Sequence, residues 1–78
     1  MRTATIETTH DDAALVAAAL APDNTSEMET TTEGDRVVTR IERDSTSGLQ
    51  STVDDYAVNV GVAERIAQTA NHTSNHNT

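Results

Sequence analysis

A chain of 78 residues without a single cysteine has to fold around one small core, with no disulfide or thiolate-bound metal to strengthen it. A domain of this length buries only about 60% of the surface that its unfolded form exposes. Where cross-links are absent, association with another chain is the usual remaining source of stability. The sequence therefore predicts one domain that gains stability from a partner.

The charge is strongly one-sided, because thirteen Asp and Glu residues face five Arg residues and no Lys, for a formal net charge of −8. Such a chain repels polyanions at ordinary salt, which argues against a nucleic-acid-binding surface. A lysine-free acidic surface is typical of proteins from very salty cytoplasm, where screening is nearly complete. An acidic protein that binds a special cationic partner is the alternative.

The sequence has no targeting or membrane signal. Residues 1–7 lack the apolar stretch of a signal peptide, and the longest apolar run is nine residues, Ala13 to Ala21. That run is too short to cross a bilayer. We therefore expect a cytoplasmic protein without membrane contact.

Residue patterns in the first half of the chain predict a strand followed by a helix. Residues 3–7 alternate small or apolar with polar side chains and include β-branched residues, which indicates a strand. Asp11 and Asp12 precede the apolar run as helix-capping residues, and Pro22 follows it. The predicted helix covers about residues 12–21.

The second half predicts a hairpin and a long helix. Residues 27–32 and 36–42 are β-prone and are separated by the short connection Glu33-Gly34-Asp35. Ser and Thr residues at 45–47 offer caps for a helix over about residues 47–70. Residues 71–78 contain only Asn, His, Thr and Ser, so we expect a disordered polar tail after a single domain at 1–70.

These elements predict an α+β fold with the order β-α-β-β-α, a three-stranded antiparallel sheet and both helices on one face. A right-handed crossover from the first strand to the second leaves room for the third strand between them. The first strand then has an open edge, where unpaired backbone groups favour self-pairing. We therefore predict a homodimer edge at Thr3, Thr5 and Glu7.

No residue constellation typical of catalysis is present, so we expect no enzyme activity, cofactor or metal. His10 is the only histidine outside the polar tail, and the three glycines are isolated rather than grouped in a phosphate-binding loop. His72 and His76 have the spacing of a metal-binding pair on a helix. Two solvated imidazoles in a disordered tail are the favoured interpretation of this pair.

The helices carry more apolar surface than one sheet can cover. In the longer helix, a second stripe formed by Val58, Val62 and Ile66 points away from the stripe predicted to face the core. The predicted core stripe comprises Leu49, Val53, Tyr56, Ala57, Val60, Ala63 and Ala67. The shorter helix is apolar around its whole circumference, although alanines are also simply good helix formers. The predicted partner interface comprises Leu15, Ala18, Ala19, Val58, Val62 and Ile66.

Two short motifs resemble one known family. Leu20-Ala21-Pro22-Asp23-Asn24 is similar to the Leu-x-Pro-Asp-Asn turn of the small subunit of the KEOPS complex, the Pcc family related to the CTAG antigens. Residues 41–44 and 48–56 are similar to that family's strand and its Leu-Arg-Ala-Ala-x-Asn-Ser-Tyr helix. Gln50 stands where the family usually has Arg, and Asp54 where it has Asn.

The resemblance implies a non-catalytic homodimer that bridges two copies of the threonylcarbamoyltransferase subunit of KEOPS. That complex makes threonylcarbamoyladenosine in tRNA, and in the family the helices of this subunit pack against helices of the transferase. Catalysis, metal and nucleotide belong to other subunits.

The alternative is a stand-alone KH-like or split-βαβ RNA-binding domain. Such a domain needs a basic or aromatic surface, whereas the chain offers five arginines and one aromatic residue. Arg36, Arg40 and Arg43 lie along one predicted strand. Clustering of these three arginines on the exposed face of the sheet would allow a weak contact with tRNA within the complex.

Overall fold

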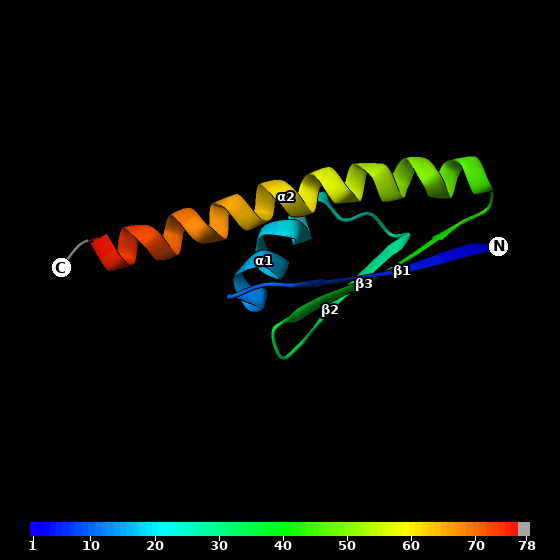
Figure 1. Ribbon diagram of the computed structural model, residues 1–78. Helices are drawn as coiled ribbons and strands as arrows, with labels where there is room; N and C mark the ends of the chain where they lie inside the picture. Colours follow the sequence, from blue (N-terminus) through cyan, green and yellow to red (C-terminus); the bar gives the residue numbers. More distant parts are fainter. Residues whose placement is uncertain (77–78) are drawn as a thin grey trace.

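The computed structural model describes residues 1–76, with the side chains of residues 1–70, and is shown in Figure 1. Three strands and two helices follow one another in the predicted order. Their bounds are β1 Arg2–Thr9, α1 Ala13–Leu20, a short 3₁₀ turn at Ala21–Asp23, β2 Met28–Glu33, β3 Arg36–Arg43 and α2 Thr46–His76.

The strands form one antiparallel sheet in the order β1-β3-β2. This confirms the α+β class and the predicted position of the third strand between the other two. Gly34 sits in the β2-β3 turn with φ of 62°, a left-handed conformation that costs glycine little. The hairpin therefore forms where the sequence placed its glycine.

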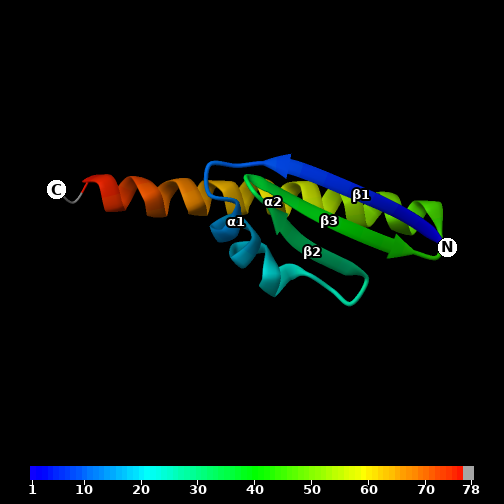
Figure 2. The ribbon, with the colours of Figure 1, turned by 90° about the horizontal axis from the view of Figure 1, so that it is seen from below.

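Both helices lie on one side of the sheet, as Figures 1 and 2 show from two directions. Val37, Thr39 and Ile41 of β3 alternate toward the helices and are fully buried. They meet Val16 and Leu20 of α1 in the core. The opposite face of the sheet carries exposed polar side chains, as expected for a two-layer domain.

Helix α1 begins and ends near its predicted signals. The Asp12 carboxylate accepts a hydrogen bond from the Leu15 backbone N–H at 3.2 Å and caps the first turn. The helix gives way to the 3₁₀ turn at Ala21, directly before Pro22. Because α1 contacts α2, β2 and β3, its own chain covers most of its circumference.

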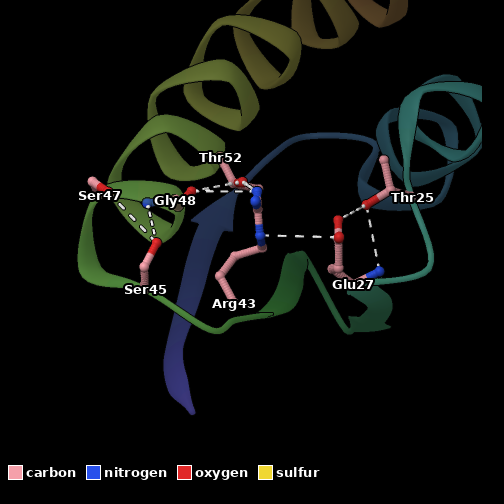
Figure 3. A network of polar contacts seen from close by, with 7 residues as sticks. All are labelled: Thr25, Glu27, Arg43, Ser45, Ser47, Gly48 and Thr52. Atoms are coloured by element: carbon pink, nitrogen blue, oxygen red, sulfur yellow. Dashed lines mark hydrogen bonds and ion pairs between the residues drawn. The ribbon is translucent and has the colours of Figure 1, made fainter.

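Helix α2 begins at Thr46, where Ser45 is its N-cap and the Ser45 hydroxyl accepts a hydrogen bond from the Gly48 N–H at 3.0 Å. The Arg43 guanidinium donates to the Thr52 hydroxyl at 2.6 Å and approaches a carboxylate oxygen of Glu27 at 3.9 Å. Figure 3 shows how these contacts join the end of β3 to the first turns of α2. They fix the direction in which the helix leaves the sheet.

Two details of α2 differ from the sequence prediction. Ala57, which the helical projection placed on the core face, is exposed, while Thr52 is buried. The helix also continues past its predicted end at Ala70, to His76. The remainder of the predicted polar tail, residues 77–78, lies outside the described residues.

A chain of polar side chains crosses the core. The Asn24 amide donates to the Thr30 hydroxyl at 2.8 Å, Thr30 and Thr39 share a hydrogen bond of 2.8 Å, and Thr39 is also hydrogen-bonded to the Tyr56 hydroxyl. Burial raises the pKa of Tyr56 above its ordinary value of 10.0, against a smaller opposing effect of the Thr39 hydrogen bond.

The burial of Tyr56 predicts a loss of stability in strong alkali. In an unfolded chain the tyrosine loses its proton near pH 10.0, whereas in the folded protein Tyr56 keeps its proton to higher pH. The free energy of unfolding should therefore be insensitive to this group below about pH 10 and fall as the pH rises through the folded pKa. Denaturant unfolding at a series of pH values across this range measures the free energy of unfolding, and tyrosinate absorbance reports the ionisation of Tyr56. In Tyr56→Phe the alkaline loss should shrink, and an unchanged loss would contradict the assignment.

The two helical glycines predict opposite responses to alanine. At Gly61 an added Cβ meets nothing within 4 Å, so Gly61→Ala should stabilise the protein by about 0.5–1 kcal/mol. At Gly48 the Cβ would lie 2.9 Å from the Ser45 hydroxyl and 3.2 Å from an Arg43 nitrogen. Gly48→Ala therefore displaces the helix cap and should be at least about 1 kcal/mol less stable than Gly61→Ala. Urea unfolding of both variants tests this prediction. Equal stabilities would contradict the close packing around Gly48.

Candidate partner-binding surface

The outward face of α2 carries three large apolar side chains that the domain does not cover. Val58 is 66% exposed, Val62 49% and Ile66 52%. Because residues four apart share one helical face, the three form a continuous stripe. The opposite face of α2 is buried through Tyr56, Ala63 and Ala67. We call Val58, Val62 and Ile66 the outer stripe.

The C-terminal part of the outer stripe borders a shallow, open hollow with a mostly apolar lining. Val62, Arg65, Ile66, Thr69 and Ala70 line it. Figure 1 shows that the C-terminal part of α2 projects beyond α1 and the sheet. Ala70 is exposed, whereas Ala67 is buried. Ala70 continues the four-residue spacing of the stripe, so the sequence contained a signal that could have added it to the predicted surface.

Helix α1 contributes less to an outer surface than its sequence suggested. Of the three α1 residues in the predicted partner interface, Leu15 and Ala19 are half-buried and pack against the core, while Ala18 is exposed. An all-apolar helix can thus be covered on most sides by one chain when it contacts both a sheet and a second helix. The apolar surface left for a partner lies mainly on α2.

A polar contact holds the middle of α2 against the end of β1. The imidazole Nδ1 of His10 meets a carboxylate oxygen of Glu64, and its Nε2 lies 2.7 Å from the Thr8 hydroxyl. The His10 backbone N–H donates to the Asp35 carbonyl at 2.8 Å. His10 is buried with both ring nitrogens engaged. Helix α2, which carries the outer stripe, is therefore held at two places, by the His10–Glu64 contact and by the contacts of Arg43.

The predicted dimer edge lies on β1, and among residues 1–76 the only strand beside β1 is β3. Thr3, Thr5 and Glu7 alternate toward the uncovered face of the sheet and are exposed. In the part of the chain that the structure describes, no strand lies beside the outer row of backbone groups along β1. Such an edge is a template for pairing with another strand.

The uncovered face of the sheet does not present a basic stripe. Arg36 lies 3.6 Å from a carboxylate oxygen of Glu7 and opposite Glu33 of β2 in the register. Arg40 approaches a carboxylate oxygen of Glu42 at 2.5 Å. Arg43 turns to the other side of the sheet, toward α2. Carboxylates thus accompany both arginines of this face, which makes it a poor match for a phosphate backbone.

No donor set for a metal appears within residues 1–70, where no three His, Asp or Glu side chains gather suitably. The side chains of His72 and His76 lie outside the described residues. Within residues 1–76, no helix combines the length and apolar character needed to span a membrane.

Some of the residues that carry the family resemblance take part in the polar hydrogen-bond chain of the core, and others are exposed. Asn24, at the end of the Leu20–Asn24 turn, and Tyr56 of α2 stand at the two ends of the polar chain that crosses the core. Gln50 and Asp54 are exposed on α2. The sequence matches no known family model. It also matches no curated protein.

Proposed function

We propose that this chain is a non-catalytic, dimer-forming subunit of a KEOPS-type complex in a salty cytoplasm. In this role it bridges two copies of the threonylcarbamoyltransferase subunit and so supports threonylcarbamoyladenosine synthesis in tRNA. The single observation that carries the proposal is the outer stripe, three large apolar side chains left exposed on an anchored helix.

Physical chemistry favours a protein partner at this stripe. Apolar patches on soluble domains commonly mark interaction sites, and a helix that offers side chains four apart fits against another helix. The order of elements and the two motifs that resemble the Pcc family agree with such a helix-mediated role. The stand-alone RNA-binding alternative is less favoured, because carboxylates flank Arg36 and Arg40 on the uncovered sheet face.

The partner can be identified by co-purification. A tagged copy of this chain, expressed in a host grown at high salt and recovered in molar KCl, should retain the transferase subunit, as identified by mass spectrometry. The matched control is the same tagged chain with Val62→Asp, which should lose that protein. Recovery of tRNA without any transferase would instead support the RNA-binding alternative.

The dimer has its own test. Sedimentation in molar KCl should show a homodimer at tens of micromolar, because a small core with an open β1 edge gains stability from self-pairing. A strictly monomeric species would refute this part of the proposal.

A further inference from the structure

Strand β2 forms the edge of the sheet opposite β1, as Figure 2 shows, and within residues 1–76 the only strand beside it is β3. Residues in an antiparallel pair alternate between bonding the neighbouring strand and pointing away from it. The Glu42 N–H donates to the Glu27 carbonyl at 3.0 Å, so the register turns the backbone groups of Thr30 and Thr32 away from β3. This edge therefore offers backbone donors and acceptors to a further strand.

Two carboxylates on the uncovered face of β2 have no partner among the ion pairs found within residues 1–70. They belong to Glu29 and Glu33, which are exposed and lie opposite Arg40 and Arg36 of β3 in the register. Both arginines instead approach carboxylates on other parts of this face. A basic side chain on a strand beyond β2 would therefore continue the alternation of charge across the sheet.

A polar hollow opens at the start of β2. The carboxylates of Glu27, Glu29 and Glu42 line it together with the Arg40 side chain. Side chains on neighbouring strands contact one another across a sheet, so a long side chain from a strand beside β2 can enter this hollow. A guanidinium group suits it, because carboxylates bind guanidinium through strong, charge-assisted hydrogen bonds.

Charge argues against a second copy of this chain at β2. Antiparallel pairing of two β2 strands centred on Thr31 would place each Glu29 opposite a Glu33, and in-register parallel pairing would place each carboxylate beside its own copy. Like charges in these positions are destabilising. Strand β1 differs, because it carries one Arg and one Glu and so has no net charge. The β2 edge therefore selects a partner strand with basic side chains.

We propose that β2 accepts an extended segment of another protein as a fourth strand, with basic side chains facing Glu29 and Glu33. Main-chain hydrogen bonds to Thr30 and Thr32 hold the segment, and the carboxylates select it. The buried area is small, which places the contact among weak, transient interfaces. It uses neither the outer stripe nor the β1 edge, so it does not rest on the proposed function.

A defined peptide tests the proposal by nuclear magnetic resonance. The probe is Thr-Arg-Thr-Val-Thr-Arg-Thr with blocked ends, whose arginines have the spacing of Glu29 and Glu33. Added to the ¹⁵N-labelled chain in about 0.5 M KCl, where the Debye length is about 4 Å, it should shift the amide signals of Thr30 and Thr32 and slow their hydrogen exchange. The Thr31 amide, which already faces β3, and the amides of β1 should change little.

Matched probes and variants separate charge from strand pairing. The same peptide with glutamates in place of its arginines should bind about tenfold more weakly or worse, and Glu29→Arg with Glu33→Arg should reverse this preference. Methylating the backbone nitrogens of the two threonines beside the valine removes donors that face β2 and should weaken binding to a similar extent. Glu7→Arg, the same charge change on β1, should leave the affinity unchanged. Circular dichroism checks that each variant folds.

Several results would overturn the inference. Equal binding of the arginine and glutamate peptides, or no binding of either at millimolar concentration, removes the selection by charge. Undiminished binding of the methylated peptide shows attraction without strand pairing, and signal changes along β1 place the contact on the other edge. Slow exchange at Thr30 and Thr32 before any peptide is added shows that a second copy already occupies β2. No transferase is present, so none of these results bears on the proposed function.

Discussion

Val62→Asp is expected to fold like the natural protein and to bind the transferase subunit at least tenfold more weakly. Val62 is half exposed on the outer stripe, so an aspartate there stays hydrated in the free protein. In a complex, the same substitution loses the burial of a valine, worth about 1.5–3 kcal/mol, and buries a charge. A binding titration in molar KCl, with circular dichroism of the free variant, measures both effects.

Ala63 provides the matched control, because it is the next residue on α2 yet only 2% exposed. Ala63→Asp would place a carboxylate inside the core and should unfold the domain. If Val62→Asp unfolds as badly as Ala63→Asp, or folds and still binds normally, the outer stripe is not the partner surface.

The second large effect is expected on removal of salt. A net charge of −8 on 78 residues creates mutual repulsion that molar salt screens almost completely. At about 10 mM salt the Debye length is about 30 Å, which exceeds the spacing of most carboxylates in a domain of this size. We therefore expect the melting temperature to fall steeply on dialysis, followed by circular dichroism.

A variant with fewer carboxylates should resist this loss. Asp54→Asn with Asp55→Asn removes two adjacent exposed charges from α2 while leaving the core unchanged. Its melting temperature should fall less than that of the natural protein between the same two salt concentrations. Identical melting of the natural protein in molar and millimolar salt would contradict halophilic adaptation.

The fold could be predicted because its signals are local. Alternation in β3 places Val37, Thr39 and Ile41 on one face, Gly34 locates the hairpin, and the capping residues and Pro22 bound α1. The handedness of the crossover then gives the strand order. Each of these inferences needs only neighbouring residues and one topological rule.

The contacts between elements were harder to predict. Helical periodicity groups residues by face, but it does not fix how that face is centred on the sheet, and so Ala57 was assigned to the core while Thr52 was not. The run of alanines in α1 indicates even less clearly which face of that helix packs against the sheet. The burial of His10 and its contact with Glu64 depend on where α2 crosses the end of β1, which neither segment reveals alone.

The surface could be predicted only in part, for the same reason. Val58, Val62 and Ile66 are too large and too regularly spaced to belong to a solvated face, and the structure leaves them exposed. Leu15 and Ala19 are also apolar and were assigned to the same surface, yet their own domain partly covers them. The difference lies in packing rather than in composition.

The most direct test of the central claim is the mass of the complex in solution. The purified chain and the purified transferase subunit, mixed in molar KCl and separated by size with light-scattering detection, should elute together with the mass of two copies of each. Val62→Asp should elute apart from the transferase. Separate elution of the natural chain from the transferase at tens of micromolar would contradict the account.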